Sequence, residues 1–386
     1  MKNTKHPIQD ALTEIAEYQD ITVLTSDIAE STKTGTLAKT HPSRFINTGA
    51  SGPLSLLLAI GLSLRGKKPV VITYAATLEP RLVNLARKNN ANITIIASHS
   101  GISTAQDGNA LHATHDTAHL RAIPTLTLIE PADSTETRRA IIASASRKGI
   151  NVIRLGKEIP EGITDKHPFL FGKANTIRLG KDCTLIASGN CLPLALRAEE
   201  RLNRQGITCT VINNSTLSPI DTHTLLSALE ETGCGVTIEE HNKHSGTGHA
   251  LSARIKEPIE KVGLSSDTES GTRSEILGKH GITVEHIIAS AKKAIARKCQ
   301  HTSRDKKTSP HTAFRLQNGK TIHSLGELAA TIATLDDATY THHANNTRND
   351  FAQWIHDVFG EKTLAQEVAS AKNKLASAST IHRWLK

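Results

Sequence analysis

Polar side chains that follow apolar runs in the first half of the chain have the types needed to bind an anionic ligand. Arg154 comes after a predicted strand, and the planar fork of a guanidinium group matches two oxygens of a phosphate group. The alternative for Arg154 is a surface salt bridge. His99 and His112 lie in predicted loops, and the ordinary expectation for a loop histidine is that its hydrogen bonds are satisfied within the protein.

The cysteines do not suggest a metal or a disulfide framework. Five of them are dispersed along the chain without any CxxC pair, which is typical of reduced intracellular thiols that pack as small apolar side chains. They are Cys183, Cys191, Cys209, Cys234 and Cys299. We therefore expect no metal site within this chain alone.

The net charge of +9 raises the question of nucleic-acid binding. The basic residues gather near Lys292 to Lys307, and no aromatic residues lie among them to stack on bases. This pattern favours a solvated helix end and linker, and we expect no nucleic-acid partner.

The elements that must position these residues follow an alternating pattern. Apolar stretches such as Ile21–Leu24, Val70–Thr73 and Ile93–Ile96 predict strands, and amphipathic or apolar stretches between them predict helices. Because the strands are apolar without alternation, we expect a mainly parallel sheet covered on both faces. Residues 1–158 are predicted to form this first α/β domain.

A second α/β domain is predicted for residues 171–298. Its strands include Thr184–Ala187, Thr208–Ile212 and Gly235–Ile238, and helices are expected near Ala250–Glu260 and over Val284–Arg297. Residues 299–312 are predicted to be a basic linker. Residues 313–386 are predicted to form a small α-rich module of unknown function, with a hairpin around Asn318-Gly319 and a core built from its aromatic residues.

The cellular location is predicted from the apolar runs of the chain and from its first residues. No apolar run reaches the ~20 residues that cross a bilayer, and Met1–His6 leads into a polar helix rather than a signal-peptide core. We expect a cytoplasmic protein without membrane contact.

Residues 8–298 resemble the C-terminal half of transketolases, or the separate C-terminal subunit of split transketolases. The order and spacing of several short runs carry the resemblance. Among them are Arg44-Phe45-Ile46-Asn47-Thr48-Gly49, Ser98-His99-Ser100-Gly101-Ile102, Gln106-Asp107-Gly108, Ile153-Arg154-Leu155-Gly156 and Glu239-Glu240-His241.

The resemblance implies a cofactor that two chains share. In this family thiamine diphosphate lies between two subunits, and the other half supplies the diphosphate and Mg²⁺ site through a Gly-Asp-Gly…Asn motif that this chain lacks. It also implies substrate-binding roles for His99, Asp107, His112 and Arg154 toward sugar hydroxyls and phosphate, and a dimer or heterotetramer.

Three positions depart from the family pattern. Gly52 stands where the family has the glutamate that activates the cofactor, so the catalytic residue is absent. Tyr74 keeps the first aromatic ring of the cofactor-binding run, and Thr77 replaces the second. Leu111 stands in place of the substrate histidine, unless that residue has slipped by one position to His112.

These features lead to three hypotheses. The first is a C-terminal subunit for two-carbon ketol transfer between phosphosugars, with a weakened active site. The second is a catalytically inactive paralogue that binds a sugar phosphate or regulates a partner subunit. The third is the β subunit of a 2-oxoacid dehydrogenase-type enzyme, which shares the two-domain plan.

Overall fold

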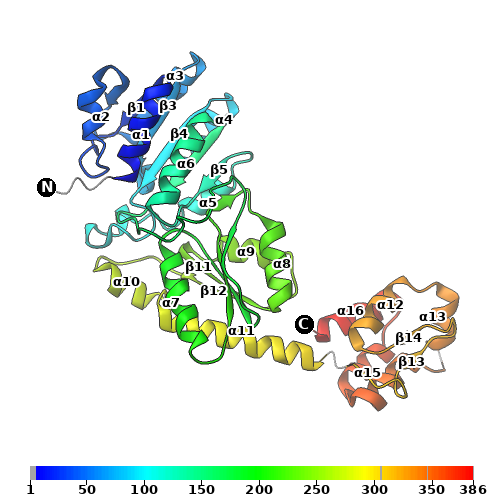
Figure 1. The fold of residues 1–386 in the computed structure, drawn as a ribbon. Helices are drawn as coiled ribbons and strands as arrows, with labels where there is room; N and C mark the ends of the chain where they lie inside the picture. Colours follow the sequence, from blue (N-terminus) through cyan, green and yellow to red (C-terminus); the bar gives the residue numbers. More distant parts are fainter. Residues whose placement is uncertain (1–5, 305–306, 346, 386) are drawn as a thin grey trace. The chain divides into compact units, whose positions relative to one another are not determined.

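The computed structural model describes residues 6–304, 307–345 and 347–385 (Figure 1). Residues 1–5 of the predicted first domain, residues 305–306 of the predicted linker, and residues 346 and 386 of the predicted module lie outside these ranges. The chain divides into two compact units, residues 1–295 and 296–386. The first unit contains both α/β domains, and each unit is described by itself.

The first α/β domain is built on a seven-stranded sheet with the strand order β10-β5-β6-β4-β3-β1-β2. All pairs are parallel except β10–β5. The strands from this part of the chain are β1 (Ile21–Thr25), β2 (Phe45–Asn47), β3 (Lys68–Tyr74), β4 (Ile93–Ser98), β5 (Thr127–Ile129) and β6 (Ile150–Arg154). The helices are α1 (Pro7–Tyr18), α2 (Gly35–Thr40), α3 (Gly52–Leu64), α4 (Pro80–Lys88), α5 (Asp116–Arg121) and α6 (Ser134–Ser146).

Both faces of this sheet are covered, which explains why its strands lack polar alternation. Val71 packs with residues of α3, α4 and α5 in one apolar cluster. Its neighbours Val70 and Ile72 pack with α1 and α6 in another. Successive side chains of a strand point to opposite faces, so both must be apolar.

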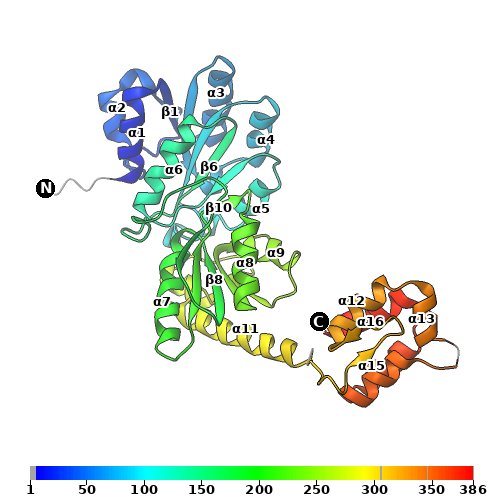
Figure 2. The same cartoon turned by 45° about the vertical axis from the view of Figure 1, so that its right-hand side comes forward.

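The second α/β domain has a five-stranded sheet with the order β12-β11-β8-β9-β7. Figure 2 shows α7 and α8 on opposite sides of it. Its strands are β7 (Asn175–Arg178), β8 (Cys183–Ala187), β9 (Cys209–Asn213), β11 (Gly235–Asn242) and β12 (Ile259–Leu264). Its helices are α7 (Leu192–Asn203), α8 (Thr222–Thr232), α9 (Thr247–Ser252), α10 (Arg273–Lys279) and α11 (Val284–Arg304). The predicted fold class, two consecutive α/β domains with mainly parallel sheets, is confirmed.

Two segments differ from the expectation. The helix expected near Ala250–Glu260 ends at Ser252, and residues from Ile259 onward form β12. Pro258 excludes a helix through its own position because proline cannot continue one, and its carbonyl accepts a 3.0 Å hydrogen bond from Gly235 at the start of the neighbouring strand. Helix α11 also continues into the predicted linker, as far as Arg304.

The short strand β10 (Thr216–Ser218) was not predicted, and it joins the two α/β domains. It leaves the second domain and pairs antiparallel with β5 at the edge of the first sheet, with Thr216 opposite Ile129. Three residues are too few to show a periodicity. The edge strand of the first sheet therefore comes from a later part of the chain, after β7, β8 and β9 of the second domain.

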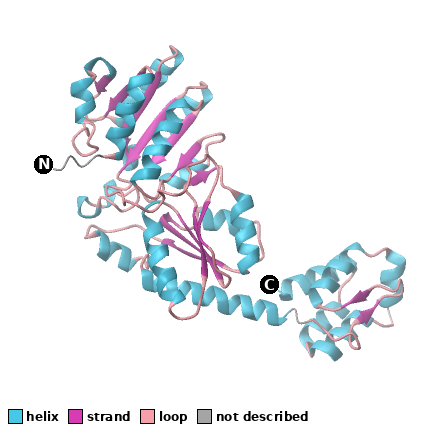
Figure 3. Ribbon diagram, viewed as in Figure 1, coloured by secondary structure: helices cyan, strands magenta, loops and turns pink. Residues whose placement is uncertain are grey.

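The C-terminal unit is mostly helical with one short hairpin (Figure 3). The hairpin strands are β13 (Phe314–Arg315) and β14 (Thr321–Ile322), and Gly319 in the turn has a φ of 84°. The helices are α12 (Leu325–Thr334), α13 (Asp337–His343), α14 (Asp350–Trp354), which continues as the π-helical turn η6 (Ile355–Phe359), α15 (Lys362–Ala369) and α16 (Lys374–Leu385). Phe314, Phe351 and Trp354 are buried together, which confirms that aromatic residues build the core of this unit.

None of the helices in the described ranges combines the length and the apolar character needed to cross a membrane.

We predict that the two units unfold separately. Both tryptophans, Trp354 and Trp384, lie in residues 296–386, so tryptophan fluorescence follows that unit alone, whereas far-UV circular dichroism is dominated by the larger unit. The two signals should give different midpoints in urea, because the units have separate apolar cores. A chain truncated after Lys298 should keep the circular-dichroism transition. Aggregation of the truncated chain would show that the C-terminal unit covers the α/β core.

Candidate functional site

The predicted site residues gather at one edge of the first sheet. Tyr74 is the last residue of β3, His99 directly follows β4, and Arg154 is the last residue of β6. These three strands are neighbours and run parallel, so their carboxyl ends meet at the same edge. Ligands of open α/β sheets bind at this edge.

The structure brings Tyr74 and His99 into direct contact. Their ring centroids are 4.5 Å apart, with an angle of 56° between the planes. His99 is 5% exposed, has a φ of 57°, and its Nδ1 lies 3.2 Å from the Ser98 hydroxyl. Burial, and then the positive charge of Lys157, lower the pKa of His99. Its imidazole is thus neutral at neutral pH and can hydrogen-bond to a hydroxyl group without bringing charge.

Gly52 begins helix α3 and faces a cluster of hydroxyl groups. A Cβ atom at this position would lie 2.9 Å from Thr73 Oγ1, 3.3 Å from the Thr77 carbonyl oxygen and 3.4 Å from Thr77 Oγ1. The two threonine hydroxyls are 3.1 Å apart, and Ser26 Oγ lies 3.5 Å from Thr73 Oγ1. We call Ser26, Thr73 and Thr77 the hydroxyl cluster.

The hydroxyl cluster occupies the place where an acid would be needed to activate thiamine diphosphate. Activation of its pyrimidine ring needs a positioned acid, yet the three nearest atoms around the Gly52 position are threonine oxygens. Threonine hydroxyls are neutral at any physiological pH. Tyr74 offers one ring for stacking, but the activating group is missing, so the residues of this chain do not fit the catalytic demand of the cofactor.

Asp107 lies beside a cation that sequence reasoning missed. Lys157 Nζ is 3.4 Å from Asp107 Oδ2, and both side chains are about half exposed, at 49% and 48%. Asp107 closes the short helical turn η3 (Ala105–Asp107), and Lys157 follows the end of β6 by three residues. The place of Lys157 just after a predicted strand could have identified it from the sequence. A residue beyond the end of a strand reaches the edge of the sheet, whereas the residues within the strand stay covered.

His112 uses both ring nitrogens inside the protein. Its Nδ1 lies 2.6 Å from Thr268 Oγ1, and its Nε2 lies 3.1 Å from the Ala105 carbonyl oxygen. A carbonyl oxygen can only accept, so Nε2 carries the proton and Nδ1 accepts from Thr268. The residue links the two α/β domains, and its predicted substrate contact has no support in this geometry.

Arg154 is enclosed rather than open to a ligand. It is 1% exposed, and its Nε donates a 2.8 Å hydrogen bond to Asp116 while NH1 donates to Glu130. NH2 donates to the carbonyl oxygens of Ala113 and Glu240. Burial alone would lower the pKa of Arg154, but the two carboxylates outweigh it and raise the pKa. Phosphate binding by Arg154 stays a prediction that this geometry does not support.

The charged residues around Arg154 cross the boundary between the two α/β domains. Glu130 also accepts a 2.5 Å hydrogen bond from Ser188 of the second domain. Glu240, on β11, accepts from the Ile102 amide at 3.2 Å and from the Arg273 guanidinium. We call Asp116, Glu130, Arg154, Glu240 and Arg273 the interdomain charge cluster.

A second buried ion pair lies at the end of β11. Glu239 accepts from the amides of Thr247 at 2.6 Å and Gly248 at 3.2 Å, and His241 Nε2 lies 3.3 Å from its carboxylate. Burial raises the pKa of Glu239, but His241 and the two amides outweigh it and lower the pKa to about 2. Burial lowers the pKa of His241, and Glu239 outweighs that effect and raises it.

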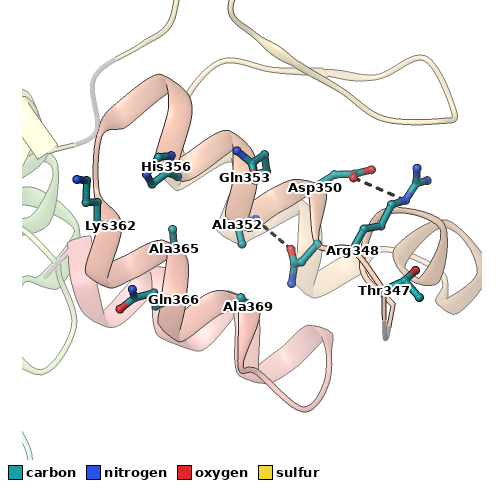
Figure 4. Close-up of a pocket in the computed structure, with 11 residues that line it drawn as sticks. Thr347, Arg348, Asp350, Ala352, Gln353, His356, Lys362, Ala365, Gln366 and Ala369 are labelled. Carbon is teal, nitrogen blue, oxygen red and sulfur yellow. Dashed lines mark hydrogen bonds and ion pairs between the residues drawn. The ribbon is translucent and has the colours of Figure 1, made fainter.

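Two further observations limit the site. No group of three or more His, Cys, Asp or Glu side chains in the described ranges is arranged to hold a metal ion. A separate hollow of about 540 Å³ lies between α14–η6 and α15 of the C-terminal unit (Figure 4). Ala352, Ala365 and Ala369 line it, with Lys362 and Arg348 toward its two ends. It contains none of the predicted site residues.

The Glu239–His241 pair predicts a pH-dependent stability. Because the pKa of Glu239 is lowered, its contribution is present above about 4.5 and is lost as the pH falls toward 2. Because the pKa of His241 is raised, its contribution is present below about 6.5 and is lost as the pH rises through the raised value. Glu239→Gln should therefore cost most between pH 4.5 and 6.5, by about 3–5 kcal/mol.

Urea unfolding of the full chain, followed by circular dichroism at several pH values, measures this cost. Glu269→Gln is the matched control, because Glu269 also pairs with a cation but is exposed, and it should leave the midpoint unchanged. A cost for Glu239→Gln that does not vary with pH would contradict the ion pair.

Comparison with known proteins agrees with the fold of the two α/β domains. The family model of the transketolase pyrimidine binding domain matches residues 2–160, and that of the transketolase C-terminal domain matches residues 172–287. The chain is 34% identical over 281 residues to transketolase-like protein 2 of Homo sapiens, covering 70% of this chain and 45% of that protein. The chain thus spans about half the length of the first curated relatives it matches.

Two other relatives are covered almost completely. The chain is 30% identical over 294 residues to one subunit of the apulose-4-phosphate transketolase of Phocaeicola vulgatus, covering 73% of this chain and 94% of that protein. A solved structure, described as split gene transketolase, inactive beta4 tetramer, superposes with a TM-score of 0.68 and 31% identity, covering 76% of this chain and 97% of the other. Through its pyrimidine-binding and C-terminal domains, this chain belongs to the transketolase family.

Proposed function

We propose that this chain is the C-terminal subunit of a two-chain transketolase, which transfers a two-carbon ketol unit between phosphosugars. The observation that carries the proposal is the extent of the family match. It covers the pyrimidine-binding and C-terminal domains and nearly all of a relative whose name describes a subunit. A separate N-terminal subunit would supply the site for the diphosphate and Mg²⁺.

The sheet edge supports a phosphosugar as substrate. His99 presents a neutral imidazole, Asp107 a half-exposed carboxylate, and Lys157 a half-exposed ammonium group. Carboxylate and imidazole groups hydrogen-bond sugar hydroxyls, and an ammonium group pairs with a phosphate. The role of this chain is to bind and orient the sugar.

The hydroxyl cluster supports a weakened active site. It leaves the position next to Gly52 without an acid, so the complex has to work without that proton transfer or receive an acid from another chain. The same observation favours the second candidate function, an inactive paralogue that binds a sugar phosphate or a partner. No observation favours a 2-oxoacid dehydrogenase-type β subunit.

Gly52→Glu distinguishes the first two functions. In the complex with an N-terminal transketolase subunit, this variant should raise ketol transfer by about 10²–10⁴, the usual worth of a general acid–base group. An added Cβ would lie 2.9 Å from the Thr73 hydroxyl and 3.3 Å from the Thr77 carbonyl oxygen, so the gain requires the Thr73 side chain to shift. The measurement is the rate of ketol transfer between phosphosugars.

Gly52→Gln is the matched control, because it has the same size without the acid and should bring no gain. If the wild-type complex already turns over at the rate of ordinary transketolases, the site is not weakened. If Gly52→Glu stays inactive while phosphosugar binding persists, the chain is a binding subunit.

Helix α3 supports assembly with further chains. Leu54, Leu57, Leu58 and Leu64 are 42–60% exposed on this helix, which is apolar all round. Contiguous exposed leucines mark a protein interface. We expect this surface to be covered in a homodimer or in a heterotetramer with the N-terminal subunit.

Leu57→Asp should therefore lower the mass of the assembly. A buried charge without a partner opposes association, so sedimentation at micromolar concentration should show the wild-type chain as an oligomer and the variant as a monomer. Leu179→Asp is the control, because Leu179 is 84% exposed and lies on the second domain. A wild-type chain that does not associate either alone or with the N-terminal subunit present would contradict this prediction.

A further inference from the structure

A pocket of about 260 Å³ lies at the amino-terminal edge of the first sheet, opposite the edge that carries the candidate site. Its lining includes the first residues of three neighbouring strands, Ile21 of β1, Lys68 of β3 and Ile93 of β4. Tyr74, at the candidate site, is the last residue of β3, and a strand rises about 3.3 Å per residue, so β3 separates the two sites by ~20 Å. A ligand in this pocket therefore does not touch the candidate site.

Four cations line this pocket, and its lining contains no carboxylate among the described residues. They are Lys67, Lys68, Arg147 and Lys148, all of them exposed. Lys67 pairs with Asp20, with 2.8 Å between Nζ and Oδ2. Lys68 donates to the side-chain oxygen of Gln19 at 3.0 Å, which is neutral. Arg147 lies over the Phe171 ring, 4.6 Å from its centroid. Within the described ranges only Lys67 has a carboxylate partner, so three positive charges are left without a negative one.

Cations at the ends of helices have an ordinary explanation, because positive charge at a helix C-terminus complements the helix dipole. Helices α3 and α6 both end at this pocket, where Ser63 and Ser146 belong to their last turns. Each C-terminus carries about half a negative charge, so the two helix ends and Asp20 together offset about two of the four cations. A surplus of about two positive charges remains, which the helices do not explain.

Two hydroxyl groups of the lining are placed to donate to an anion. Ser63 Oγ accepts from the Asn92 amide at 2.7 Å, and Ser146 Oγ accepts from the Gln19 side-chain amide at 2.8 Å. Neither hydroxyl donates to an acceptor in the described residues, so the hydrogen of each is available to a ligand. Gln19 also accepts from Lys68, and it thereby links a cation of β3 to the hydroxyl at the end of α6.

We propose that this pocket binds a phosphate dianion, either free or as the head group of a small organic phosphate. Lys68, Arg147 and Lys148 supply the charge, and Ser63 and Ser146 donate hydrogen bonds to the phosphate oxygens. The surplus of about two positive charges matches the charge of a phosphate monoester near neutral pH. The site goes beyond the proposed function, because it lies away from the sheet edge at which the sugar would bind.

Calorimetry with the purified full chain at about pH 7.5, where a phosphate monoester is largely a dianion, tests the proposal. Phenyl phosphate and inorganic phosphate should both bind, and phenol should not bind measurably. Lys148→Gln should weaken both ligands about tenfold or more, as expected for a lost charged hydrogen bond. Phenyl phosphate that binds about as tightly as inorganic phosphate supports a site for the free ion, whereas tighter binding of phenyl phosphate supports a site for an organic phosphate.

Ser146→Ala separates a built site from a merely basic surface. The substitution changes no charge, yet it should weaken both phosphates severalfold because one donor to the anion is lost. Lys39→Gln is the matched control for Lys148→Gln, because Lys39 is an exposed cation in the last turn of α2 and lies outside the pocket. It should bind as the wild type does.

The proposal is overturned if neither phosphate binds, or if Lys148→Gln and Ser146→Ala leave the affinity unchanged. Loss of binding in Lys157→Gln alone would place the anion at the candidate site, which supports the proposed function and removes the pocket. A single-stranded oligonucleotide that binds more tightly than either phosphate and is weakened by Lys148→Gln would make the surface a nucleic-acid contact, and this result also overturns the proposal. An inert two-chain complex would end the proposed function and leave the phosphate site standing.

Discussion

The guanidinium group of Arg154 is the constraint on which the arrangement of the two α/β domains depends. It is buried between them, and a buried charge is tolerated only when charged and polar partners surround it. Asp116 and Glu130 neutralise it from the first domain, and the Glu240 carbonyl reaches it from the second. Removing Arg154 would leave the buried carboxylates of Asp116 and Glu130 without the positive charge that they share. The interdomain charge cluster therefore fixes the position of one domain on the other.

The same cluster fixes the loop that carries the candidate site. Glu240 accepts from the Ile102 amide, and the Ala113 carbonyl accepts from Arg154, so both ends of the segment from 102 to 113 are tied to the buried charges. Asp107 lies at the middle of this segment, where the side chain is half exposed. A rigid frame with an exposed middle is what a binding loop requires. The proposed ligand contact of Asp107 thus depends on the buried Arg154 and Glu240, which hold the two ends of its loop.

The sequence was sufficient for features that depend on local pattern. The apolar strands and intervening helices predicted a doubly covered parallel sheet, and Asn318-Gly319 predicted the hairpin, because side-chain periodicity and turn chemistry act over a few residues. The sequence also showed that glycine stands at position 52. It did not show that the Thr73 hydroxyl fills the space beside Gly52, because Thr73 belongs to a different element and only the fold brings the two together.

The environment of Arg154 shows why other features could not be predicted. An arginine at the end of a strand can face solvent or a buried carboxylate. Which of the two occurs depends on whether a second domain covers the arginine, and the residues around it in the sequence do not contain that information. Helix expectations failed for a related reason at Pro258, where pairing with β11 decided the conformation. Long-range pairing also produced β10, whose three residues carry no periodic signal.

Strand β10 has a consequence for how the chain is made. Its partner β5 precedes it by roughly 90 residues, which a ribosome takes roughly 5–20 s to add. During that interval a nascent first domain presents β5 as a bare edge, with amide and carbonyl groups free to pair with another strand. Closure of the first sheet therefore waits until the residues that form β10 have been synthesised.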